Sequence, residues 1–286
     1  MQRRFFSGAP RDLGFEQGQA FREAIRADAR ALGWESAGSW WARRRQRRGT
    51  GPDPALGRDL ARHFPHLDER LSGLAAGAGL PREALLVLLE EELRGDAVVQ
   101  TTGVGVGPAG SPVLVLRLRT PFPPTGLLAR TCQPDGGYRH VALARPALAA
   151  ALAGVNEQGL AAAAEPLDPP SHVRDGDRSA SPSLLLLDQC LERLDTVEKA
   201  LEWCERRPGG GRARFVFVDA AGGVGALDLD GERRLRCEPP SLAPEAGEAW
   251  ALLDPAARTI ELRLPGVAPE RIGIEPAGST PPAPGA

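Results

Sequence analysis

The chain has 286 residues, 42% hydrophobic and 25% charged, which is the composition of a globular protein long enough to bury a sizeable core. Its 35 basic and 37 acidic residues leave a net charge of −2, so no overall field draws it to nucleic acid or to an anionic membrane. No apolar run approaches the roughly 18 residues of a membrane span, and the first ten residues lack the apolar segment of a secretory signal. We therefore expect a cytoplasmic protein without nucleic-acid or membrane partners.

Four widely spaced cysteines are present, and none of them forms a C-x-x-C motif. With only four histidines in the chain, this spacing gives no support to a zinc site, and we expect neither a metal nor another cofactor. Reduced and mostly buried thiols are the simplest expectation for Cys132, Cys190, Cys204 and Cys237.

The first third of the chain has helical patterns. Residues 11–32 carry apolar side chains at helical spacing, and two further helical segments are expected over 55–78 and 81–94. The basic run at 43–48 is interpreted as a solvated helix end. A helical region is therefore predicted over residues 1–96.

From residue 97 onward the sequence favours strands joined by hairpins. Helices are expected only at 184–194 and in the segment after Asp195, and residues 276–286 are expected to form a mobile tail. This order predicts an α+β fold with a core over 97–275 that forms one domain with the preceding region. The expected strand segments are 97–107, 111–120, 138–145, 158–164, and hairpins over 212–237 and 248–266.

Several stretches in the same order resemble the acyl-CoA:6-aminopenicillanic-acid acyltransferase family, the cysteine-dependent branch of the N-terminal-nucleophile (Ntn) hydrolases. GVNEQGLA is the most specific of them, and together they span most of the chain. The stretches are LGFEQGQAFREAIR (13–26), QTTGVGVGPAGSPVLVLRLRTP (100–121), GVNEQGLA (154–161), LLLLDQCLERLDTVEKAL (184–201), RFVFVDAAGG (214–223) and WALLDPAARTIELRLPG (250–266).

The resemblance implies a four-layer αββα sandwich and a precursor that cleaves itself before a cysteine, whose α-amino group then acts as the base. The sequence departs from that pattern at the catalytic positions. Gln100 stands where the family has its nucleophile, and an amide cannot attack a carbonyl. Arg117 and Arg119 replace an Asn-x-Asp stretch, and Arg214 replaces an asparagine. The long segment that separates the two final hairpins in the family is also missing between residues 237 and 248.

These departures predict an Ntn-fold protein that has lost cysteine catalysis and serves as a ligand-binding or structural module, with a small acyl or anionic compound as the expected ligand. Gln100, Thr102, Arg117, Arg119 and Arg214 are expected in the former catalytic cleft. No cofactor is expected there.

The alternative is an active amide hydrolase or acyltransferase that uses Thr101 as nucleophile. A one-residue shift along a strand turns a side chain to the opposite face, so this alternative needs a bulge or an altered register. Asn156 would polarise the substrate carbonyl, or else it forms a turn before the neighbouring glycine. Other nucleophile or base types have simpler interpretations: Cys132 and His140 as packed residues, and Ser179, Ser181 and Ser183 as loop or helix-cap residues.

Overall fold

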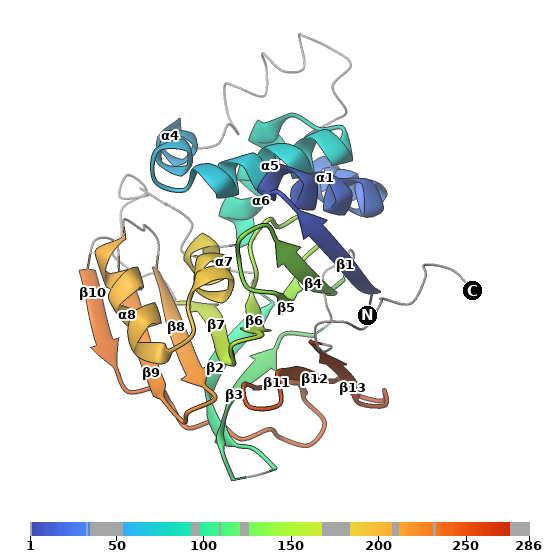
Figure 1. Cartoon of the computed structure of the whole chain (residues 1–286). Helices are drawn as coiled ribbons and strands as arrows, with labels where there is room; N and C mark the ends of the chain where they lie inside the picture. The colour runs from blue at the N-terminus through green and yellow to red at the C-terminus, as the bar shows by residue number, and fades with distance from the viewer. Residues whose placement is uncertain are drawn as a thin grey trace, which may run out of the picture.

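The computed structural model describes residues 2–32, 34, 54–92, 98–108, 110–120, 126–167, 184–207, 212–230 and 233–274. It confirms a mixed α+β architecture with two sheets and a set of N-terminal helices (Figure 1). Three sequence predictions lie outside the described residues: the solvated basic run at 43–48, the loop serines at 179, 181 and 183, and the mobile tail at 276–286.

The N-terminal region is helical as expected, but it begins with an unexpected strand. β1 pairs in parallel with β4, so the start of the chain belongs to the larger sheet. The helix expected over 11–32 is divided at Phe21, whose backbone leaves helical geometry while its ring is buried. The elements are β1 (Gln2–Gly8), α1 (Pro10–Ala20), α2 (Arg22–Ala31), α4 (Pro54–His63), α5 (Pro65–Ala78) and α6 (Arg82–Glu92).

The larger sheet has the strand order β1-β4-β5-β6-β7-β8-β9-β10, and all of its pairings after β1 are antiparallel. The 212–237 hairpin predicted from its turn residues is confirmed, whereas β4, β6 and β10 were not expected as separate strands. β6 lies in the segment that was expected to join strands 138–145 and 158–164 directly. The strands that follow β1 in this sheet are β4 (Leu128–Pro134), β5 (His140–Ala144), β6 (Ala153–Asn156), β7 (Leu160–Pro166), β8 (Arg212–Asp219), β9 (Val224–Asp230) and β10 (Arg233–Cys237).

The smaller sheet has the order β13-β12-β11-β3-β2, so the two expected hairpins lie side by side in it. Its strands are β2 (Val99–Val106), β3 (Pro112–Leu118), β11 (Ala249–Asp254), β12 (Thr259–Arg263) and β13 (Glu270–Gly273). The remaining two helices are α7 (Leu184–Arg193) and α8 (Val197–Arg206).

The described elements form three layers, not the four that we expected. α7 packs on β6 and β7, α8 packs on β8 and β9, and the smaller sheet covers the opposite face of these strands (Figure 1). The expected helical layer outside the smaller sheet is absent from the described part of the chain. The short connection at 238–248 runs beside β2 through a bridge between Val104 and Ser241 and contains no helix.

Glycines allow α1 and α5 to approach closely. A Cβ on Gly14 would lie 2.0 Å from the carbonyl oxygen of Arg70, and one on Gly77 would lie 2.2 Å from that of Phe15. Gly18 and Gly73 lie equally close to the facing backbone. The glycine spacing of the first helix is therefore a packing device that holds α5, and Arg70 with it, close to α1 and the larger sheet.

None of the described helices is by itself long and apolar enough to cross a membrane. α5 and the first part of α6 pass that test only together, as a pair bent by 114°, on length and composition alone.

Candidate functional site

A β-bulge lies at Gln100, the residue that the sequence resemblance aligns with a nucleophile. Val99 pairs with Leu118 and Thr101 pairs with Arg117, so Gln100 is the extra residue of β2. Val99 is buried, Gln100 is exposed and Thr101 is partly buried. The position that resembles the nucleophile therefore carries an exposed amide.

The bulge does not bring Thr101 to the inner face. Thr101 is opposite Arg117, and Arg117 is opposite Trp250, so these three side chains lie on the same face of the smaller sheet. Leu116, the neighbour of Arg117 on β3, is buried and lies on the other, inner face. Thr101 thus lies on the outer face of the smaller sheet, while Thr102 is opposite Leu116 and faces the larger sheet.

The two arginines expected beside position 100 are engaged by the protein itself. The Arg117 guanidinium contacts Glu245 at 2.9 Å and Glu248 at 2.8 Å, so two carboxylates neutralise its charge. Arg119 is exposed just beyond β3, and its backbone N–H donates to the Val98 carbonyl at 2.8 Å. Because Arg117 is already neutralised, it does not support the expectation that Arg117 and Arg119 together bind an anion.

The inner face carries a row of polar side chains next to Thr102. Glu165, Arg214 and Asp228 are direct cross-strand neighbours on β7, β8 and β9. Arg214 donates to both oxygens of Asp228, at 2.7 and 2.8 Å, and lies 3.6 Å from Glu165. The hydrogen bond from Arg214 lowers the pKa of Asp228, whereas burial raises the pKa of Glu165.

Thr102 and Glu165 have the chemistry of a nucleophile and a base but not the access that catalysis needs. The Thr102 hydroxyl donates to Glu165 Oε2 at 3.1 Å, and the Thr102 backbone N–H donates to the same oxygen. Thr102 is completely buried, so no substrate carbonyl can approach its Oγ1. These contacts join β2 of the smaller sheet to β7 of the larger one.

Asn156 lies on the opposite face of the larger sheet and does not contact Thr101. Its side-chain amide donates to the carbonyls of Leu191 and Leu194, and its Oδ1 accepts from the N–H groups of Gln158 and Leu160. All of its hydrogen-bonding capacity is used for the turn after β6 and for the end of α7. The structure thus gives Asn156 the turn-forming role and no oxyanion role.

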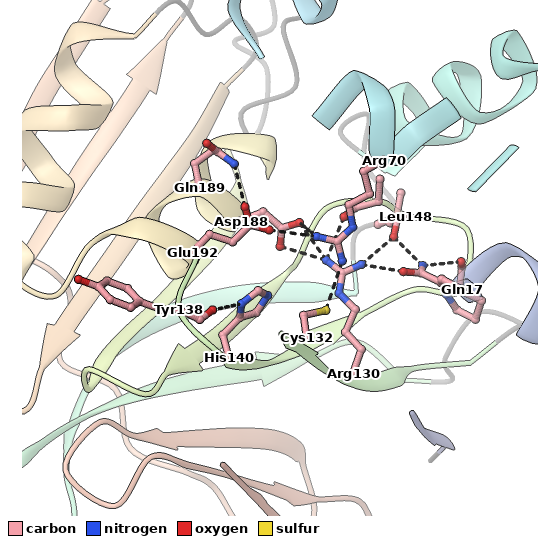
Figure 2. Close-up of polar contacts among 12 residues, drawn as sticks. Gln17, Arg70, Arg130, Cys132, Tyr138, His140, Leu148, Asp188, Gln189 and Glu192 are labelled. Atoms are coloured by element: carbon pink, nitrogen blue, oxygen red, sulfur yellow. Dashed lines mark hydrogen bonds and ion pairs between the residues drawn. The ribbon is translucent and has the colours of Figure 1, made fainter. Parts of the chain in front are cut away.

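Sequence reasoning missed a second polar cluster, which lies between the larger sheet and the N-terminal helices (Figure 2). Asp188 on α7 accepts hydrogen bonds from Arg130 at 3.0 and 3.1 Å and from Arg70 at 3.0 Å. Arg130 also donates to Gln17 Oε1 at 3.1 Å. Arg70, Arg130 and Asp188 are each at most 1% exposed, so this is a fully buried ionic network.

A cysteine and a histidine complete this cluster. Cys132 and His140 are opposite each other on β4 and β5, and Arg70 donates to the Cys132 sulfur at 3.3 Å. His140 Nδ1 lies 3.2 Å from the Tyr138 carbonyl, which can only accept, so Nδ1 carries a hydrogen. The other ring nitrogen, Nε2, is buried and has no hydrogen-bond partner among the described residues.

Charge balance sets the protonation of these groups. Burial raises the pKa of the Cys132 thiol, but Arg70 and His140 more than offset it and bring that pKa to about 7. The pKa of His140 is raised because its interactions with Cys132 outweigh burial. Burial and the neighbouring Asp188 raise the pKa of Glu192, which lies 3.3 Å from Arg70. Three groups of the cluster can carry a positive charge and three can carry a negative charge, so its net charge can be zero. The first three are Arg70, Arg130 and His140, and the others are Cys132, Asp188 and Glu192.

The buried cluster places a thiol and an imidazole opposite each other on neighbouring strands, and these are residue types that a cysteine hydrolase uses. However, Cys132 and His140 are both completely buried, so the thiol meets no substrate in this structure. A sequence signal for the cluster does exist. Arg70 and Asp188 interrupt strongly apolar helical segments, LDERLSGLAA and LLLLDQCL, at positions that face the core. No set of three or more potential metal ligands occurs among the described residues.

Comparisons with known proteins add a distant likeness. No protein-family model matches the chain, and no curated protein matches it in sequence. Among solved structures, it is similar to penicillin V acylase from Agrobacterium tumefaciens, with 16% sequence identity and a TM-score of 0.34. That match covers 49% of this chain and 52% of the acylase chain, so the chain spans about half the length of the structure it matches.

Proposed function

We propose that this chain is a non-catalytic, Ntn-like module with a structural role, and that it neither cleaves itself nor hydrolyses amides. The observation that carries the proposal is the bulge in β2. It leaves the exposed amide Gln100 at the position of the family nucleophile and places Thr101 on the outer face, away from the polar row of Thr102 and Glu165.

The state of the former cleft supports the same proposal. A catalytic cleft needs a nucleophile that the substrate can reach and polar groups left open for the reacting atoms. Here Thr102 and Glu165 satisfy each other, and Arg214 is held by two carboxylates. These contacts stabilise the join between the two sheets.

A structural role is favoured over binding of an acyl or anionic ligand, which stays a prediction. Arg117, on the outer face of the smaller sheet, and Arg214, in the inner polar row, are each paired with two carboxylates. A ligand anion would have to displace those carboxylates, so neither arginine offers a ready anion site.

The test is reaction of the purified chain with a panel of acyl amides and with an acylating probe for N-terminal nucleophiles. Thr101→Val and Thr102→Val serve as matched variants, because valine keeps the shape of threonine and removes the hydroxyl. We expect no turnover and no acylated residue in any of the three proteins. Turnover or acylation that disappears only in Thr101→Val would establish the Thr101 hydrolase instead.

A further inference from the structure

Two cysteines from consecutive helices lie in contact on the helical side of the larger sheet. The Sγ atoms of Cys190 on α7 and Cys204 on α8 are 3.6 Å apart. Both residues are completely buried, and both are free thiols in this structure. α7 rests on β6 and β7 while α8 rests on β8 and β9, so this contact joins helices that cover different parts of the sheet.

We propose that Cys190 and Cys204 form a redox-active pair whose oxidation to a disulfide fastens α7 to α8. A disulfide has a sulfur–sulfur distance close to 2.05 Å, so the two sulfurs need to approach by about 1.5 Å. The other two cysteines have different partners. Cys132 is bound by Arg70, and Cys237 lies 3.5 Å from the Asp228 carboxylate.

A small peroxide supplies the oxidising equivalents, because it is small enough to enter when the helices fluctuate. In the first step, one thiolate attacks hydrogen peroxide and becomes a sulfenic acid, and the displaced hydroxide takes up the thiol proton to give water. In the second step, the other thiol attacks the sulfenic sulfur and releases a second water. Two thiols and one peroxide thus give one disulfide and two waters, with two electrons passing from sulfur to peroxide.

The surroundings set the rate of this reaction. Burial raises the pKa of the Cys190 thiol well above its ordinary value, so Cys190 stays protonated at neutral pH. Oxidation is therefore slow near pH 7 and accelerates as the pH rises, because the thiolate is the reacting species.

The bridge would act on the buried charged cluster through α7. Asp188 and Glu192 are four residues apart on one face of this helix and contact Arg70, whereas Cys190 lies between them on the face toward α8. A disulfide lowers the conformational entropy of the unfolded chain, so it favours the folded state in which α7 holds its native position. Oxidised protein should therefore unfold at a higher temperature than reduced protein.

The test is peroxide treatment of the full chain at pH 8, followed by iodoacetamide labelling under denaturing conditions and intact-mass analysis. The reduced protein carries four reactive thiols. We expect a 190–204 linkage in the peptide map and loss of the labels on these two cysteines. The peptide map separates this bridge from oxidation of Cys132, whose pKa of about 7 makes its thiol reactive at pH 8. Cys237→Ser is the matched control and should still form the bridge, whereas Cys204→Ser should not form it or show the rise in unfolding temperature.

Three results would overturn the proposal. The first is retention of all four thiols after peroxide treatment, including treatment in urea too dilute to unfold the protein but sufficient to increase helix opening. The second is a bridge that involves Cys132 or Cys237. The third is over-oxidation of Cys190 or Cys204 to sulfinic acid without a bridge.

Discussion

Replacing Asp188 by asparagine should destabilise this protein strongly. The Asp188 carboxylate receives hydrogen bonds from Arg130 at 3.0 and 3.1 Å and from Arg70 at 3.0 Å, and all three side chains are buried. Asparagine keeps the shape but removes the negative charge and turns an N–H₂ group toward a guanidinium. Two buried cations then lose their shared counter-ion.

The magnitude follows from this loss of a buried partner. Breaking a buried ion pair by removing one member costs about 3–5 kcal/mol, which is a large part of the roughly 5–15 kcal/mol that stabilises a typical domain. Glu192 remains 3.3 Å from Arg70 and compensates in part, so we expect the lower end of that range.

Urea unfolding followed by far-UV circular dichroism measures this difference. Asp195→Asn is the control on the same segment, because Asp195 forms an exposed i,i+4 pair with Lys199, and it should leave the unfolding midpoint nearly unchanged. Equal midpoints for the Asp188 and Asp195 variants would refute the reasoning.

The same pair of proteins gives a pH test. Arg130 and Arg70 outweigh burial and hold the pKa of Asp188 below its ordinary value of 3.8. A carboxyl whose pKa is lowered by folding stabilises the native state above its unfolded pKa and loses that effect as the pH falls through the folded value. The difference between wild type and Asp188→Asn should therefore shrink in acid.

Three further predictions concern other parts of the fold. Folding lowers the pKa of Cys132 from 9.0 to about 7, so wild type should gain stability over Cys132→Ser as the pH rises from 7 to 9, by about 2 kcal/mol in urea unfolding; a constant difference would contradict this. Gly14→Ala should lower stability by about 1–3 kcal/mol or more because its Cβ would meet a backbone oxygen at 2.0 Å. In the matched helical substitution Gly57→Ala, the added Cβ would come closest to the flexible end of Arg82, at 3.3 Å, so the change should be neutral or stabilising by up to about 1 kcal/mol. Gln100→Cys should be labelled rapidly by iodoacetamide, because position 100 is exposed, without self-cleavage or amide turnover; efficient turnover would show that a supporting catalytic network survives.

Local patterns were sufficient for much of the fold. The alternation in 111–120 and the turn residues at 219–223 predicted elements that the structure contains. The capping signal expected at Asp195 predicted α8, but the residue that caps this helix is Thr196. β1 was missed because only Phe6 of its residues is buried, so it has no alternating pattern. The fourth layer was expected from the family resemblance alone.

The candidate sites were harder to predict because they depend on contacts between distant segments. Arg70 and Asp188 are 118 residues apart in the chain and meet only because α5 packs on α1, which contacts β1 and β4, while α7 packs on β6 and β7 of the same sheet. The Cys132–His140 pairing follows from the register of β4 with β5, and β4 itself was not predicted. The sequence indicated that catalysis by Thr101 would need a bulge or an altered register in its strand. The register of β2 was needed to show that the bulge turns Thr102 inward instead.

Intact-mass analysis of the purified protein tests the central claim most directly. A chain without a working nucleophile cannot perform the acyl shift that matures Ntn enzymes, so the non-catalytic account predicts a single species near 30.3 kDa. Two fragments that correspond to residues 1–100 and 101–286, with Thr101 at the new N-terminus, would contradict it.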